Sequence, residues 1–157
     1  MSMIRNAVVC TLGLVVACGG DATVVDEPVV VAPATPSFTS RVVATGLGSP
    51  WEVVWGPDDY LWVTERAGKR IVRVNPVDGS QTVAHEIPEA YQAVRQDGVL
   101  GMALHPELLE GTGHDLVYVA WNYDIDPGDT VDVRTRIQRL TYDPASSTLG
   151  DVVEVIS

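Results

Sequence analysis

Cysteine is scarce in this 157-residue sequence, because its two cysteines, Cys10 and Cys18, both lie near the N-terminus. The chain beyond residue 18 therefore has no disulfide and no cysteine metal site to offer. Three catalytic or nucleotide-binding patterns are also missing: a Ser-His-Asp set, a phosphate-binding glycine loop and a dinucleotide-binding fingerprint. These absences argue against the enzyme and nucleotide-binding classes that such patterns identify.

Positive charge is the second shortage. Lys and Arg number 10 against 21 Asp and Glu, which gives a net charge of −11 at pH 7. Nucleic-acid phosphates need a basic binding surface, so the composition argues against a nucleic-acid partner. The acidic balance favours solubility and allows cation binding, but it does not identify a substrate.

Residues 1–17 are typical of an export signal. Arg5 supplies the positive charge, and the apolar run over residues 7–17 is too short to span a bilayer. Small residues precede Cys18, a pattern that resembles a bacterial lipobox, although Val15 stands where leucine is commoner. We predict an exported chain that is lipid-anchored through Cys18 to the periplasmic or cell-surface face of a bacterial membrane. The alternative is an ordinary cleaved signal peptide with an incidental cysteine.

Residues 18–37 are predicted to be a linker. Pro28, Pro33 and Pro36, with several acidic residues, interrupt Val, Ala and Thr without a sustained period. Proline removes a backbone donor and favours extended chain, so we expect a semi-rigid spacer. The valines at residues 29–31 offer an alternative, which is one additional strand.

From residue 38 to residue 157 the pattern is one of short strands separated by turn residues. We expect a first strand at Phe38–Thr45 and then a unit of four strands, at Trp51–Trp55, Tyr60–Thr64, Arg70–Asn75 and Gln81–Ile87. Each connection within the unit contains Gly, Pro or Asp, which tight turns require. No helical window competes, because β-branched residues and helix breakers recur too often.

A second unit repeats the order of the first. The corresponding segments are 53–57 and 102–106, 61–64 and 117–120, and 70–74 and 136–140. Both units then reach a proline-containing turn, at Pro76 and Pro144, and each has a fourth strand, at residues 81–87 and 152–156. The second unit also has a long insertion, residues 122–134, between its second and third strands.

A four-strand repeat of about 40–50 residues is typical of β-propeller blades. We therefore predict an all-β fold with about two blades, at residues 51–87 and 99–156. A propeller closes with about four to eight blades, so two blades alone would leave an apolar face and strand edges open. A β-sandwich, which has the same strand rhythm, is the alternative.

The joint between the two units, residues 95–106, has the most specific pattern in the chain. It reads Arg-Gln-Asp-Gly-Val-Leu-Gly and ends in His-Pro, and it follows a Thr-Glu-Arg turn at residues 64–66 and Asn-Pro at residues 75–76. In order, spacing and motif, residues 40–156 resemble the N-terminal portion of the soluble PQQ-dependent glucose dehydrogenases and the related aldose and sorbosone dehydrogenases.

The resemblance implies a six-bladed propeller that binds PQQ and Ca²⁺ and oxidises a sugar hydroxyl by hydride transfer to PQQ. Of the family's site residues only Gln96 falls on a matching position, that of a glutamine that hydrogen-bonds the sugar. An amide suits this role because it both donates and accepts, although Gln96 can also be a loop residue that holds its own backbone. The family's catalytic histidine lies beyond the second blade, past Ser157, and its PQQ and calcium ligands lie on later blades. No catalytic, cofactor or metal residue is assigned here, and the chain alone is expected to be inactive.

The three histidines favour structural roles. His105 precedes Pro106 and is expected to pack or to cap the turn, His114 falls in a surface loop, and His85 falls on a strand. Their spacing does not predict a zinc site.

Two further residue groups are interpreted as structural. Four aspartates in the insertion offer oxygen ligands to Ca²⁺, but their spacing departs from the EF-hand pattern, so a solvated acidic loop is favoured; they are Asp124, Asp126, Asp129 and Asp132. Four tryptophans are expected to lie in the blade cores; they are Trp51, Trp55, Trp62 and Trp121.

Three hypotheses follow. The first is the N-terminal portion of an exported, lipid-anchored PQQ-type sugar dehydrogenase. The second is a non-catalytic binding module at the cell envelope, derived from a propeller, which contacts a partner through the Gln96 loop or the acidic loop. The third is a small structural lipoprotein with a β-sandwich.

Overall fold

The computed structural model describes residues 36–157, with the exception of residues 94, 95 and 129. Residues 39–157 form one compact unit. The predicted signal peptide, the lipidation at Cys18 and the linker up to residue 35 lie outside the described residues. In the part that is described, all regular structure is β, and no helix is long and apolar enough to cross a membrane.

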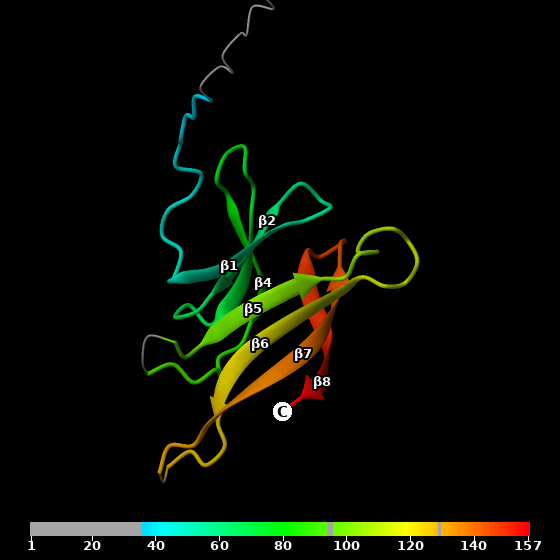
Figure 1. The fold of residues 1–157 in the computed structure, drawn as a ribbon. Coiled ribbons are helices and arrows are strands. Elements are labelled where there is room, and N and C mark those ends of the chain that lie inside the picture. Colours follow the sequence, from blue (N-terminus) through cyan, green and yellow to red (C-terminus); the bar gives the residue numbers. More distant parts are fainter. Residues whose placement is uncertain (1–35, 94–95, 129) are drawn as a thin grey trace, which may run out of the picture. The chain divides into compact units, whose positions relative to one another are not determined.

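Eight strands form two four-stranded antiparallel sheets, each with its strands in sequence order (Figure 1). The first sheet contains β1 (Pro50–Trp55), β2 (Leu61–Glu65), β3 (Arg70–Val74) and β4 (Gln81–Glu86). The second contains β5 (Val99–Leu104), β6 (Leu116–Asp124), β7 (Val133–Asp143) and β8 (Thr148–Ile156). The predicted all-β fold of four-strand units is confirmed.

The predicted strand at Phe38–Thr45 is wrong, because these residues, all of which the structure describes, have no strand structure. Val43 and the following Leu47 instead cover a buried cluster on one face of the first sheet, formed by Val63, Val72 and Val74. The side chain of Gln81 donates a hydrogen bond to a carbonyl of this segment at 2.8 Å. Val43 and Ala44 of the predicted strand are therefore used for packing across a sheet, whereas Phe38 and Val42 are exposed.

The predicted insertion at residues 122–134 is partly strand. β6 and β7 remain paired from Asn122 opposite Thr135 to Asp124 opposite Val133, which leaves residues 125–132 as the connection. One carboxylate oxygen of Asp124 accepts the backbone N–H of Asp126 at 3.2 Å and that of Asp132 at 3.1 Å. Asp124 thus caps the backbone of the turn, a common role of aspartate.

The two sheets pack face to face, and the faces in contact are not equivalent in the sequence repeat. In the shared core, Trp62 and Ile71 of the first sheet lie with Val117 and Leu140 of the second. Because side chains alternate along a strand, Tyr118 points to the opposite face of β6 from Val117. In the sequence repeat Trp62 corresponds to Tyr118, so the packing is head to tail: the face that the first sheet buries is the one that the second sheet leaves uncovered by described residues.

The prediction for the tryptophans holds for two of the four. Trp62 and Trp121 are buried, whereas Trp51 and Trp55 are 49% and 58% exposed. Both exposed rings lie on β1, an edge strand of its sheet. On the other side of β1, Val54 packs against the shared core. The alternation was recognised in the sequence, but the buried side of β1 was assigned incorrectly.

Candidate functional site

The two most specific motifs of the sequence meet in the structure. The turn after β2, with the Thr-Glu-Arg motif at residues 64–66, contacts the segment 97–100 that leads into β5. Figure 1 shows β5 running alongside β1, which places the start of the second sheet against the first. This joint is the candidate site, because it positions Gln96.

Gly98 allows the closest approach within the joint. It is buried with φ at 130°, and a Cβ at this position would overlap the carbonyl oxygen of Arg66. Its N–H donates to Oδ1 of Asn122 at 3.3 Å, and its carbonyl accepts the backbone N–H of Asn122 at 3.0 Å. Glycine alone fits such a conformation and spacing without strain.

Side chains from the Thr-Glu-Arg motif hold the residues on either side of Gly98. Nη1 of Arg66 donates to the carbonyl of Asp97 at 3.0 Å. Oγ1 of Thr64 donates to the carbonyl of Leu100 at 2.6 Å and accepts the backbone N–H of Glu52 at 3.0 Å. Three carbonyls of this segment, those of residues 97, 98 and 100, thereby accept hydrogen bonds from neighbouring strands and turns.

The fully buried side chain of Glu65 fixes the turn that follows β2. Its carboxylate accepts from Nε of Arg70 at 2.6 Å and from Nη2 at 3.3 Å. These hydrogen bonds raise the pKa of Arg70 above its usual value. A buried carboxylate is tolerated only with such partners. Gly68 completes the packing, since a Cβ there would overlap the Glu65 carboxylate.

Gln96 lies at the exposed end of this arrangement, one residue before the anchored Asp97. The anchors fix the backbone on its C-terminal side and leave its side chain at the surface. A primary amide offers both donors and an acceptor to neighbouring hydroxyls. One such side chain suits a substrate contact and does not by itself make a catalytic centre.

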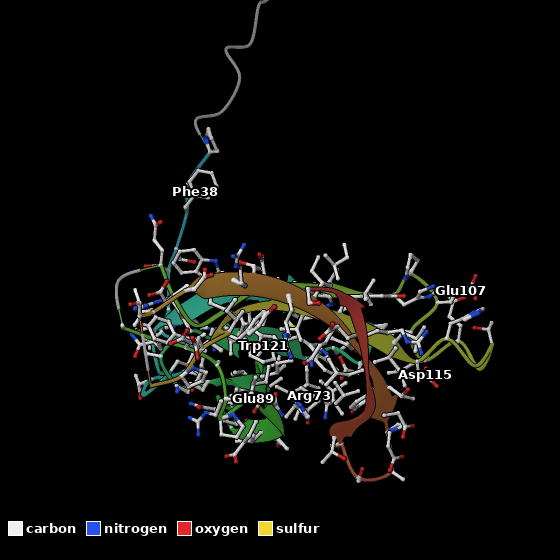
Figure 2. All side chains as sticks on the ribbon, turned by 90° about the horizontal axis from the view of Figure 1, so that it is seen from below. Phe38, Arg73, Glu89, Glu107, Asp115 and Trp121 are labelled. Carbon is white, nitrogen blue, oxygen red and sulfur yellow. The ribbon has the colours of Figure 1, made fainter. Side chains whose placement is uncertain are left out.

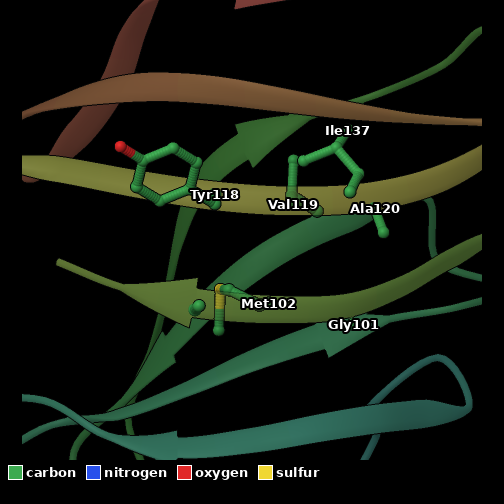
Figure 3. A pocket seen from close by; sticks show the side chains of 7 residues that line it. Gly101, Met102, Tyr118, Val119, Ala120 and Ile137 are labelled. Atoms are coloured by element: carbon green, nitrogen blue, oxygen red, sulfur yellow. The ribbon is translucent and has the colours of Figure 1, made fainter. Parts of the chain in front are cut away.

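Two hollows in the described part of the chain lie away from Gln96. The first, of about 250 Å³, is an apolar depression over the middle of the second sheet, on the uncovered face that contains Tyr118 and Ala120 (Figure 3). The second, of about 400 Å³, lies between the β1–β2 turn and residues 104–106. Neither is lined by Gln96.

Several groups that could hold PQQ or calcium already have partners within the chain. PQQ carries carboxylates, which call for cationic partners, but the guanidinium groups of Arg70, Arg73 and Arg134 are each paired with a carboxylate of the chain itself. In the acidic loop, Asp124 caps two backbone N–H groups and Asp132 pairs with Arg134.

Two features of this region were not predicted from the sequence. Asn122 was placed in the insertion, yet it is buried on β6, and its Nδ2 donates to Oγ1 of Thr135 at 2.9 Å. The second feature is a group formed by His105, Glu107 and His114, whose potential ligand atoms lie within 4.8 Å of one another. The burial of Asn122 could have been suspected, because it is a polar residue that continues the apolar run of β6. The spacing of the histidines gave no sign that His105 and His114 lie together.

The histidines otherwise occupy the predicted positions. Nδ1 of His105 accepts the backbone N–H of Glu107 at 3.1 Å, so His105 caps its turn as expected. His114 is exposed in the loop, and His85 lies on β4 with Nδ1 at 3.1 Å from the carbonyl oxygen of Leu149 in the second sheet.

Comparisons with known proteins agree with the fold. The family model described as Glucose / Sorbosone dehydrogenase matches residues 47–157. Quinoprotein glucose dehydrogenase B of Acinetobacter calcoaceticus is 33% identical over 125 residues, which cover 77% of this chain and 25% of that protein. This chain therefore spans about a quarter of the length of that relative.

Solved structures show the same relation. The PQQ-bound aldose sugar dehydrogenase of Streptomyces coelicolor is 32% identical with a TM-score of 0.58, and the match covers 74% of this chain and 32% of that one. The apo form of the soluble aldose sugar dehydrogenase of Escherichia coli has a TM-score of 0.60 at 20% identity, over 74% of this chain and 31% of that one. At that identity the second match supports the fold alone.

Proposed function

Because the chain belongs to the glucose/sorbosone dehydrogenase family, we propose that residues 39–157 are two blades of a PQQ-dependent sugar dehydrogenase. In such an enzyme PQQ would supply the hydride acceptor for the carbon that bears a sugar hydroxyl, and a base would take the hydroxyl proton. In this proposal the described blades supply a rigid frame and one sugar contact, while the base and the cofactor ligands belong to other blades. The two blades alone are then inactive.

The contact between the Thr-Glu-Arg turn and the Gln96 segment is the observation on which this proposal rests. Arg66 and Thr64 of the first sheet bond the backbone immediately after Gln96, and Asn122 of the second sheet bonds it from the other side. A substrate contact must be held in a fixed geometry to contribute to binding. Three polar side chains hold the segment that follows Gln96 in place.

The uncovered face of the second sheet supports the presence of further blades. Arg73 of the first sheet lies against the ring of Tyr142 from the second, with 5.2 Å between the guanidinium carbon and the ring centroid. Arg139 is the corresponding residue of the second sheet, and its buried Nε has no hydrogen-bond partner among the described residues. Head-to-tail packing repeats until a ring closes, so a third blade would cover Arg139 as the second covers Arg73.

A chimaeric enzyme tests the proposal. Residues 39–157 would replace the matching blades of the Streptomyces coelicolor aldose sugar dehydrogenase, and the product would be loaded with PQQ and calcium and assayed for sugar oxidation with a dye acceptor. We expect PQQ binding and turnover. Gln96→Ala should lower kcat/KM for the sugar by about three- to tenfold, the value of one neutral hydrogen bond, and leave PQQ binding intact.

Gln92→Ala is the matched control, since Gln92 lies in the same connection and is not assigned to the sugar. Equal kinetics for Gln96→Ala and Gln92→Ala would remove the sugar contact. A folded chimaera that binds no PQQ would instead favour the second candidate, a non-catalytic binding module at the cell envelope. The exposure of Gln96 is the observation that favours this alternative.

We also propose that the chain is exported and lipid-anchored through Cys18. The sequence contains only two cysteines, which makes the test simple. In bacteria grown with labelled palmitate, Cys10→Ser should retain the label and Cys18→Ser should lose it. Label retained in Cys18→Ser would place the lipid on another residue, and a parent chain that takes up no label would leave the ordinary signal peptide as the explanation.

A further inference from the structure

The connection between β5 and β6 brings together three potential metal ligands that are separated in sequence. His105 follows β5 directly, Glu107 is two residues further, and His114 lies just before β6. The rings of His105 and His114 lie 5.0 Å apart between centroids, with a tilt of 30°. Figure 2 labels Glu107 and Asp115, which both belong to this connection.

The backbone of the connection is held independently of the three ligands. The N–H of His105 donates to the carbonyl of Leu116 at 2.9 Å, which closes the base of the connection. Oδ1 of Asp115 accepts the N–H of Leu109 at 2.6 Å, and Leu108 is buried in the shared core. The ligands are therefore carried on a folded turn, and they can come together without ordering a new loop.

The chemistry of the group is that of a carboxylate beside two imidazoles. Nδ1 of His114 lies 2.8 Å from Oε2 of Glu107. Two histidines with one carboxylate are an established ligand set for zinc when a fourth position is left open.

We propose that His105, Glu107 and His114 bind one divalent transition-metal ion of the zinc type on the β5–β6 connection. Ligand bonds of about 2.0–2.2 Å place tetrahedral ligand atoms about 3.3–3.6 Å apart. The three atoms already lie within 4.8 Å of one another, and Glu107 and His114 have exposed side chains that can move the remaining distance. The fourth position faces solvent.

Coordination of a metal by His105 would break one hydrogen bond of the turn, which loose association of the metal would not do. The lone pair of its Nδ1 now accepts the N–H of Glu107. If the metal binds Nδ1, it takes this lone pair; if it binds Nε2, the ring proton must move to Nδ1, which then no longer accepts. In both cases the Glu107 amide loses its acceptor. The site does not depend on the proposed dehydrogenase function, and its test uses no sugar or PQQ.

Nuclear magnetic resonance of the full chain tests the site, because the sequence has only three histidines. All samples would contain Cys10→Ser and Cys18→Ser, so that thiolates do not compete for the metal. On titration with Zn²⁺ we expect the imidazole signals of His105 and His114 and the backbone amide signal of Glu107 to shift, while the signals of His85 stay unchanged. Zinc that shifts all three histidines equally, or none, overturns the proposal.

Variants measured by calorimetry complete the test. His114→Ala and Glu107→Gln should each weaken Zn²⁺ binding by more than about tenfold, since even residues that only orient a ligand contribute that much. His85→Ala is the matched control and should bind Zn²⁺ as the parent chain does. Zinc should also raise the melting temperature of the parent chain and not that of His114→Ala. Equal affinity in His114→Ala and His85→Ala would contradict the site.

Discussion

The two sheets have the same strand order, but the acidic residue after their first strand has different partners and different burial. Asp58 and Glu107 each follow the proline that ends the turn after the first strand of their sheet. Asp58 is nearly buried, accepts Nε1 of Trp62 at 3.1 Å and pairs with Arg73. Glu107 is half exposed and pairs with His114. Equivalent positions in the repeat thus hold a buried ion pair in one sheet and a surface cluster in the other.

The difference comes from what covers each sheet. Arg73 lies over the rings of Tyr60 and Trp62 of its own sheet, and Tyr142 of the second sheet closes over it. Arg139, its counterpart, lacks such a cover among the described residues. A buried charge needs a complete set of partners, so a blade of this type reaches its final polar structure only when the next blade is in place.

Removal of Asp58 should have the largest effect on stability. The substitution to alanine can be compared with the same substitution of Glu107, at the equivalent position of the second sheet. Asp58→Ala leaves Arg73, whose side chain is 7% exposed, without its carboxylate. We expect the free energy of unfolding to fall by about 3–5 kcal/mol. Glu107→Ala, at the equivalent exposed position, should change it little. Urea unfolding measures both, and similar losses would show that Asp58 is not the buried centre described here.

The joint between the sheets gives the next prediction. Gly98→Ala places a Cβ against the Arg66 carbonyl at a positive φ, and we expect a loss of about 3 kcal/mol in the free energy of unfolding. Gly101→Ala is the control from the same segment, since a Cβ there meets no atom within 4 Å. Equal stability of the two variants in urea would mean that the joint opens at little cost.

The smallest effect concerns the turns between the third and fourth strands, where both sheets use an aspartate. A hydrogen bond from the Ser80 backbone lowers the pKa of Asp78, and one from the Ser146 hydroxyl lowers the pKa of Asp143. A carboxyl whose pKa is lower in the folded chain stabilises it above the unfolded value, about 3.9, and this contribution is lost as the pH falls through the folded value.

Asp78→Asn and Asp143→Asn should therefore lose less stability than the parent chain when the pH is lowered from 6 to about 3. Asparagine keeps the turn geometry, so little change is expected at pH 6. Carbon-13 titration of the two carboxyls gives their pKa values directly. Values at or above the ordinary range for aspartate would contradict the prediction for that turn.

Much of the fold was predictable because strand length, turn residues and the internal repeat are local properties. The four strands of the first sheet end within one residue of their predicted limits. The match to the Glucose / Sorbosone dehydrogenase model over residues 47–157 confirms the family resemblance that the motifs indicated. Phe38–Thr45 was misassigned because its pattern is compatible either with pairing along a strand or with packing across a sheet, and only the tertiary structure decides.

The candidate site was less predictable. The motif identified Gln96, but the sequence gave no means of seeing that Arg66 and Asn122 hold its segment, since these residues are 30 and 26 positions away from it. The exposure of Trp51 and Trp55 has a similar origin, because alternation identifies two faces of a strand without saying which one is buried. The grouping of His105 with His114 depends on the path of one turn.

The ring contact between Trp62 and Tyr142 makes the docking of the sheets visible to optical spectroscopy. The centroids lie 5.0 Å apart at 76°, and the two residues belong to β2 and β7. Near-ultraviolet circular dichroism reports fixed aromatic packing, whereas the far-ultraviolet signal reports the strands themselves. A chain in which each sheet is formed but the two are undocked would therefore keep its far-ultraviolet spectrum and lose the dichroism of this pair, so one spectrometer distinguishes the assembly of a blade from the assembly of blades.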